Sequence, residues 1–164
     1  MALRKIRQQG DDILHKKAKP VKEINAGTLQ LLDDMLETMD ANDGLGLAAP
    51  QVGVLRRIVV IRVEDALFEL INPEIIETEG EQRRNEGCLS VPGKSGTVIR
   101  PQRVAVKALN RQGETVTVEG TELLAVAFCH ELDHLEGVLF TDKALEVHDV
   151  TAEEEEDEDS AEKA

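Results

Sequence analysis

The chain has 164 residues, of which 41% are hydrophobic, and it carries a formal net charge of −14. This length and composition are typical of a globular domain with its own core. The acidic charge argues against a nucleic-acid-binding protein, and the lack of an apolar run of roughly 18 residues argues against a membrane-spanning one. We therefore expect a cytoplasmic protein with no direct nucleic-acid contact and no membrane partner.

The aromatic content indicates the kind of core, and the distribution of charge separates a folded domain from an acidic tail. Only 2% of the residues are aromatic, with no Trp and no Tyr, so the core must consist of aliphatic side chains. Residues 151–164 contain eight carboxylates against one lysine, a net charge of −7. A segment of this composition cannot bury enough apolar surface to fold. We therefore expect a single domain over residues 1–150 and an acidic, disordered tail over residues 151–164.

The first elements in chain order are an arm and a helix. Residues 1–24 form the arm, in which we expect a short helix from about Asp11 to Ala18. Residues 28–41 place apolar side chains at the three- and four-residue spacing of an amphipathic helix, with Thr28 as the expected cap. The turn-forming sequence Asn42-Asp43-Gly44 ends this helix, and a glycine-rich apolar loop follows.

Strands precede a second helix. Because the strands come in blocks and do not alternate with helices, the fold class is α+β, with mainly antiparallel sheets packed around a buried C-terminal helix. The last two strands are separated by a turn sequence and form a hairpin. The expected strands span residues 57–63, 66–71 with a possible extension over 75–79, 104–109 and 115–119, and the helix spans residues 121–136.

The buried helix carries a His-Glu-x-x-His motif. Its first half, residues 123–129, is almost wholly apolar, which is typical of a helix buried on most sides. His130 and His134 are four residues apart, so their imidazoles lie within about 40° of one another around the helix and can bind one metal ion. Glu131 lies next to the first histidine, where a carboxylate can accept a proton from water. The motif therefore predicts metal-assisted hydrolysis.

A hydrolytic metal site needs a third protein ligand and an open position for water. Neither Glu136 nor the region of Glu146 and His148 offers a clear candidate downstream of the helix. The best remaining candidate is Cys88, because a thiolate suits Fe(II), Zn(II) and similar ions. Cys129 is the helix residue just before His130, and its side chain points about 100° away around the helix. We therefore expect it to be a plain buried thiol. No apolar signal core follows the basic start of the chain, so we expect both cysteines to be reduced.

Three separated segments resemble the motifs of the peptide deformylase family. Residues 44–51, Gly-Leu-Gly-Leu-Ala-Ala-Pro-Gln, are similar to the first motif, G-φ-G-φ-A-A-x-Q, where φ is an apolar residue. Residues 86–90, Glu-Gly-Cys-Leu-Ser, are similar to the second, and residues 130–134 are similar to the third. Each motif alone is short, but the three in this order are highly specific, and the resemblance extends from the N-terminal arm to about Ala144.

The resemblance implies a function and a metal. It implies hydrolysis of the formamide at the N-terminal formyl-methionine of newly synthesised polypeptides, near the ribosome, with release of formate. It also implies that Fe(II) is the native ion, for which Zn, Ni or Co can substitute. The implied ligands of that ion are Cys88, His130 and His134.

The resemblance also implies roles for four further residues. Glu131 takes a proton from water and delivers it to the leaving amine, which leaves poorly without it. The Gln51 side-chain amide and the Leu89 backbone N–H donate to the developing oxyanion. Gly46 is the expected contact with the substrate backbone. Apart from these four, Glu86 is a candidate for pairing with Arg100 or orienting a ligand, and a plain surface charge is an equal alternative.

Three other functions fit parts of the sequence. A zincin-type metallopeptidase shares the helix motif but does not use the cysteine ligand. A metal-binding or redox-sensing protein without enzymatic activity could be built on Cys88 and Cys129. An inactive relative of the deformylases is disfavoured because Gln51, Cys88 and Glu131 are all present. The sequence leaves the oligomeric state open.

Overall fold

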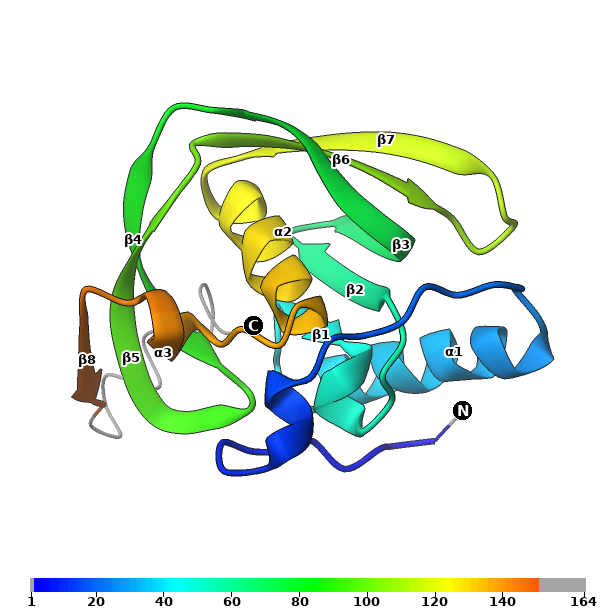
Figure 1. The fold of residues 1–164 in the computed structure, drawn as a ribbon, viewed down its shortest axis with the longest axis horizontal. Helices are drawn as coiled ribbons and strands as arrows, with labels where there is room; N and C mark the ends of the chain where they lie inside the picture. The colour runs from blue at the N-terminus through cyan, green and yellow to red at the C-terminus, as the bar shows by residue number, and fades with distance from the viewer. Residues whose placement is uncertain (1, 151–164) are drawn as a thin grey trace.

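The structure is a computed structural model that describes residues 2–150. Two antiparallel sheets lie around one central helix, α2 (Glu122–Leu135), and a second long helix lies beside the larger sheet (Figure 1). This arrangement confirms the predicted α+β class with a buried C-terminal helix. The predicted acidic tail, residues 151–164, lies outside the described residues. No helix within residues 2–150 is long and apolar enough to cross a membrane.

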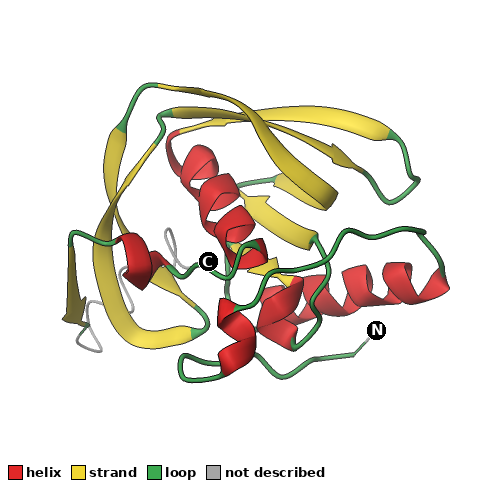
Figure 2. Cartoon of the chain, in the orientation of Figure 1, coloured by secondary structure: helices red, strands yellow, loops and turns green. Residues whose placement is uncertain are grey.

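Figure 2 draws the strands of both sheets in yellow. The larger sheet has the strand order β1-β2-β3-β6-β7, and the smaller one has the order β4-β5-β8. The five-stranded sheet consists of β1 (Gly46–Ala48), β2 (Ile58–Val63), β3 (Ala66–Glu79), β6 (Arg103–Leu109) and β7 (Thr115–Thr121). The three-stranded sheet consists of β4 (Gln82–Cys88), β5 (Val91–Arg100) and β8 (Glu146–Asp149). The helices are α1 (Ala26–Ala41), α2 (Glu122–Leu135) and the short α3 (Phe140–Lys143).

The structure confirms the predicted hairpin, in which β6 and β7 pair from Arg103↔Thr121 to Leu109↔Thr115. It also confirms the extension of the second predicted strand, because β3 runs without interruption to Glu79. Register shifts between Ile71 and Glu77 let this long strand bend out of the larger sheet. The smaller sheet was not predicted. Glycines, arginines and a proline in its strands hide the alternation of apolar and polar side chains that identifies a half-buried strand.

Both predicted helices form, with differences at their ends. Asn25 caps α1 by accepting a hydrogen bond from the Thr28 N–H at 3.0 Å, so the prediction of Thr28 as the cap is wrong by three residues. The predicted helix in the arm is reduced to a single 3-10 turn, Asp12–His15. α2 ends at Leu135, and Gly137 follows with φ of +76°. A Cβ at Gly137 would lie 2.6 Å from the backbone of His15, so only glycine fits where the arm crosses the end of this helix.

Helix α2 is buried because its apolar side chains pack against the five-stranded sheet. Phe128 is fully buried there, with its ring edge-on to Phe68 at a centroid distance of 5.4 Å. The other members of this core are mainly Val, Ile, Leu and Ala, which confirms the expected aliphatic core. Burial of α2 along most of its length gives its polar residues at 130–134 a fixed environment in place of water.

The N-terminal arm holds together the segments that carry the predicted motifs. The Arg7 N–H donates to the Gln51 carbonyl at 2.7 Å, and the Gln9 N–H donates to the Ser90 carbonyl at 2.7 Å. The Ala18 N–H donates to the Leu135 carbonyl at the end of α2. These backbone bonds join the glycine-rich loop, the β4–β5 turn and the central helix to a single strap of chain.

Candidate metal centre

Cys88, His130 and His134 come together inside the protein. Cys88 ends β4, and the two histidines lie one turn apart on α2. The sulfur and one nitrogen of each imidazole lie within 4.8 Å of one another, and all three side chains are buried. The Cys88 Sγ lies 3.5 Å from Nε2 of His134. One sulfur and two imidazole nitrogens at this spacing can bind a single transition-metal ion and leave a fourth position open.

Hydrogen bonding orients the His130 ring toward this cluster. Its Nδ1–H donates to Oε1 of Glu86 at 2.8 Å, so its Nε2 is left as the free ligand atom. Within residues 2–150, that Nε2 is buried and has no hydrogen-bond partner. A buried nitrogen without a partner is costly in a native protein, and a metal ion would satisfy it. The residues present therefore fit a metal ion.

Glu86 is held by a buried chain of charges. Arg100 donates to both Glu86 oxygens, at 2.8 and 2.9 Å, and also to Asp133 at 2.7 Å. Lys143 in turn contacts Asp133 at 3.1 Å. Burial opposes a charge on Glu86, but the hydrogen bonds from Arg100 and His130 lower its pKa to about 2. The pairing of Glu86 with Arg100, suggested from the sequence, is confirmed, and Asp133 is a second salt-bridge partner of Arg100.

Without a bound cation, the pKa values of the two histidines shift in opposite directions. Burial opposes the charged form of His130, but the adjacent Cys88 and Glu86 raise the pKa of His130 well above its usual value. Burial and the positive charge of His130 lower the pKa of His134 well below its usual value. A proton on His130 would compete with a bound metal ion, because a histidine ligand must be neutral.

Glu131 projects from α2 into a fully buried environment. Neither of its oxygens has a hydrogen-bond partner within residues 2–150, and burial raises its pKa to about 7. A Cβ on Gly46 would lie 2.6 Å from Oε2 of Glu131, so the Glu131 carboxyl group lies directly against the Gly46 backbone. Gly46 therefore makes room for Glu131, a reason for glycine that the sequence alone did not indicate. A carboxyl group with a pKa near 7 can both accept and return a proton.

Gln51 lies beside the sulfur. Its Oε1 accepts from the Ala48 N–H at 2.9 Å, which fixes the amide so that its Nε2 points at Ser90 Oγ, 3.1 Å away, and at Cys88 Sγ, 3.6 Å away. The Ser90 N–H also donates to the Cys88 sulfur at 3.4 Å. Leu89 lies between Cys88 and Ser90 in the β4–β5 turn. Sequence reasoning did not single out Ser90, although it lies within the second motif.

The remaining cysteine lies outside this cluster. Cys129 is buried and free, and burial raises its pKa to about 11, so its thiol stays protonated and unreactive. This confirms the expectation of a plain buried thiol, and Cys88 and Cys129 form no disulfide in the structure. Phe128 and Val91, which flank the ligands in the sequence, are both packed in the hydrophobic cores.

Comparison with known proteins gives matches over nearly the whole described chain. The family model described as "Polypeptide deformylase" matches residues 3–149. The peptide deformylase of Acetivibrio thermocellus is 65% identical over 145 residues, which are 88% of this chain and 85% of that protein. The crystal structure of the peptide deformylase from Thermotoga maritima has a TM-score of 0.86 at 40% identity, over 89% of this chain and all of that one. The peptide deformylase structure from Legionella pneumophila has a TM-score of 0.85 at 44% identity, over 87% of this chain and 86% of that one.

Proposed function

This chain belongs to the peptide deformylase family of metal-dependent hydrolases, which remove formyl groups from nascent peptides, and we propose that Cys88, His130 and His134 hold its catalytic metal. The observation that carries this proposal is the convergence of three buried ligand atoms within 4.8 Å. The partnerless Nε2 of His130, directed away from the hydrogen bond to Glu86, supports it.

The proposed native metal is Fe(II), with Zn, Ni or Co as substitutes. One thiolate and two imidazoles suit any of these ions, so the proposal of iron rests on the family resemblance. Bound there, the metal would polarise the formyl oxygen and lower the pKa of water. Glu86 and Arg100 would keep Nε2 of His130 directed at the ion, because hydrogen bonds to the second nitrogen of a ligating imidazole fix its orientation and tautomer.

Glu131 is the proposed proton carrier. Its buried carboxyl group, with a pKa of about 7, can take a proton from the attacking water and return it to the amine nitrogen that leaves. An amine leaves poorly without that proton, so the same side chain would serve both steps. The close contact with Gly46 supports this role, because it restricts where the carboxyl group can lie.

Gln51 and Leu89 are the proposed donors to the oxyanion. The Gln51 amide is fixed at its oxygen by the Ala48 N–H, so its Nε2 is held beside the Cys88 sulfur and the Ser90 hydroxyl before substrate binds. A neutral amide stabilises negative charge without competing for a cation. The Leu89 backbone N–H would be the second donor. Gly46, on the edge strand β1, is the proposed contact for an extended substrate backbone.

The substrate is the formylated N-terminus of newly made polypeptides, and the proposed setting is the cytoplasm, close to the ribosome. The zincin-type peptidase considered from the sequence is not favoured. The helix motif is common to both classes, but Cys88 lies in the ligand cluster, and the relatives of this chain are deformylases.

A formate-release assay on a short formyl-methionyl peptide tests this function, using the full chain loaded anaerobically with Fe(II). We expect formate release by the wild type and a loss of roughly 100-fold or more in Glu131→Gln with unchanged metal content. Glu136→Gln is the matched control, because Glu136 lies five residues further along at the exposed end of the same helix. An inactive wild type with one bound metal per chain would contradict the proposed function.

A further inference from the structure

Ser90 is a buried polar side chain to which the proposed mechanism gives no role. It follows Cys88 by two residues in the β4–β5 turn and is fully buried. Burying a hydroxyl is costly unless a hydrogen bond satisfies it. The partner of this hydroxyl is the side-chain amide of Gln51, whose Nε2 lies 3.1 Å from the Ser90 Oγ. The hydroxyl is therefore bound to a group that is itself a proposed donor to the oxyanion.

The Gln51 amide needs two fixed points to hold its plane. Its last side-chain torsion has broad minima, so a hydrogen bond at the oxygen alone leaves the amide free to rotate. The first fixed point is the Ala48 N–H, which donates to Oε1 at 2.9 Å and so determines which end of the amide is the oxygen. The second is the Ser90 hydroxyl, which accepts from Nε2 at the other end. Nε2 also donates to the Cys88 sulfur at 3.6 Å, so its second N–H is directed at the candidate metal centre.

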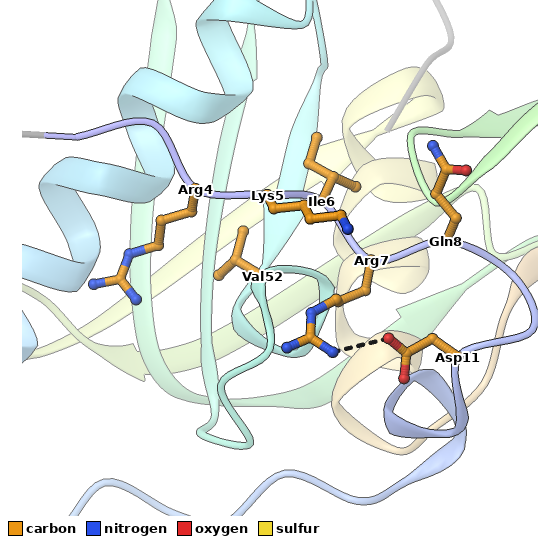
Figure 3. Close-up of a pocket in the computed structure, with 7 residues that line it drawn as sticks. All are labelled: Arg4, Lys5, Ile6, Arg7, Gln8, Asp11 and Val52. Carbon is orange, nitrogen blue, oxygen red and sulfur yellow. Dashed lines mark hydrogen bonds and ion pairs between the residues drawn. The ribbon is translucent and has the colours of Figure 1, made fainter.

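The N-terminal arm fixes the backbones of Gln51 and Ser90 relative to each other. The Arg7 N–H donates to the Gln51 carbonyl at 2.7 Å. Two residues further on, the Gln9 N–H donates to the Ser90 carbonyl, also at 2.7 Å. Figure 3 shows this part of the arm, residues 4–8, along the hollow of about 780 Å³ that it lines. Because both carbonyls bind the same short piece of chain, the contact between the two side chains is preorganised.

We propose that Ser90 is a positioning residue for deformylation, whose hydroxyl holds the Gln51 amide so that one N–H is directed at the oxyanion as it forms. The inference rests on the proposed function, in which Gln51 is a donor to that oxyanion. A donor that is already aligned needs no reorganisation when negative charge develops, and this alignment is what lowers the barrier. Ser90 acts through Gln51 and makes no bond to the oxyanion of its own.

Ser90 also contacts the Cys88 sulfur, but it does so through its backbone. The Ser90 N–H donates to that sulfur at 3.4 Å. Replacement of the side chain by alanine keeps this N–H and removes only the hydroxyl. An effect on metal binding and an effect on the orientation of Gln51 can therefore be separated in a single variant.

Steady-state formate release from a short formyl-methionyl peptide by the Fe(II)-loaded full chain tests the proposal. Ser90→Ala should lower kcat about tenfold, a part of the roughly 100-fold or more that loss of an oxyanion donor costs. KM should stay within about twofold, because the weakened interaction is made only in the transition state. In a Gln51→Ala background the same change should cost less than about twofold, since the group that Ser90 positions is gone.

Cobalt binding checks that the metal centre itself is intact in this variant. Titration of metal-free Ser90→Ala with Co(II) should give the wild-type affinity and the wild-type thiolate-to-cobalt absorption band, because the backbone contact with Cys88 is kept. A weakened or shifted band would mean that the hydroxyl supports the metal ligands and not Gln51, which would overturn the proposal.

Ser95→Ala is the matched control. Ser95 lies five residues further along, on β5, and is equally buried, but its hydroxyl has no hydrogen-bond partner within residues 2–150. It should keep the wild-type kcat. A wild-type kcat in Ser90→Ala, equal losses in the two serine variants, or a full loss from Ser90→Ala in the Gln51→Ala background would each overturn the proposal and leave the proposed function intact. An inactive wild type would contradict the proposed function itself, and this proposal with it.

Discussion

Arg100 and Arg103 each bind more than one carboxylate, but they lie in opposite environments. Arg100 is 3% exposed and contacts two carboxylates, those of Glu86 on β4 and Asp133 on α2. Arg103 is 24% exposed and contacts three carboxylates at the surface of the larger sheet, those of Glu77, Glu79 and Glu119. The number of ion pairs is larger at Arg103, yet burial makes each charge at Arg100 far more dependent on its partners.

The buried network around Arg100 and the exposed network around Arg103 differ in which parts of the protein they position. The exposed network joins strands β3, β6 and β7, which already pair through their backbones. The buried network ends on Nδ1 of His130, so it determines where a metal-binding nitrogen points. A buried ion network often adds little stability over an apolar one of the same shape. We therefore interpret the Arg100 network as a device for orientation, and four predictions test this comparison.

The largest expected effect is that of Arg100→Met. This variant leaves the buried Glu86 and the partly buried Asp133 without their shared cation, so we expect the free energy of unfolding to fall by about 3–5 kcal/mol. Urea denaturation of the metal-free protein measures this. A loss below about 1 kcal/mol would mean that the buried network resembles the exposed one.

The second prediction concerns the loss of stability at low pH. The pKa of Glu86 is lowered from 4.5 to about 2 in the folded protein, so its contribution to stability is complete above pH 4.5 and is lost as pH falls toward 2. That contribution is about 3 kcal/mol. Urea denaturation of the metal-free protein between pH 5 and 2 should show this loss, and Glu86→Gln should show less of it. If the free energy of unfolding fell equally with pH in the wild type and in Glu86→Gln, the loss of stability in acid would not come from Glu86.

The third prediction concerns metal affinity. Glu86→Gln keeps the size of the side chain but removes the charge that holds His130 and Arg100. We expect metal to bind about 10- to 100-fold more weakly, as measured by competition with a chelator. Glu119→Gln removes one carboxylate of the exposed network and serves as the matched control, with unchanged affinity. Equal affinities for both variants would show that Glu86 does not orient the ligand.

The smallest expected effect is that of Arg103→Met. Its partners are exposed and remain solvated when the arginine is lost, so the free energy of unfolding should fall by about 1 kcal/mol or less. Thermal or urea unfolding measures this, and metal affinity should not change. A loss comparable to that of Arg100→Met would remove the distinction between the two networks.

Several of these features could be predicted from the sequence, because they depend on local spacing. The four-residue separation of His130 and His134, the apolar run before them and the β6–β7 hairpin are all local patterns. The contact of Glu131 with Gly46 and the hydrogen bond of Glu86 to His130 join residues 85 and 44 positions apart in the sequence. Such contacts depend on how β1 and β4 pack against α2, which no local pattern specifies. The smaller sheet was missed for a related reason, since its strands lack the expected alternation.

The central claim is that a sulfur and two imidazoles bind one metal ion, and cobalt spectroscopy tests it most directly. Titration of the metal-free protein with Co(II) should give one ion per chain and a thiolate-to-cobalt absorption band. The account predicts that Cys88→Ser abolishes this band and that Cys129→Ser, the same change at the other buried cysteine, retains it. Persistence of the band in Cys88→Ser, or its loss in Cys129→Ser alone, would contradict the proposed metal centre.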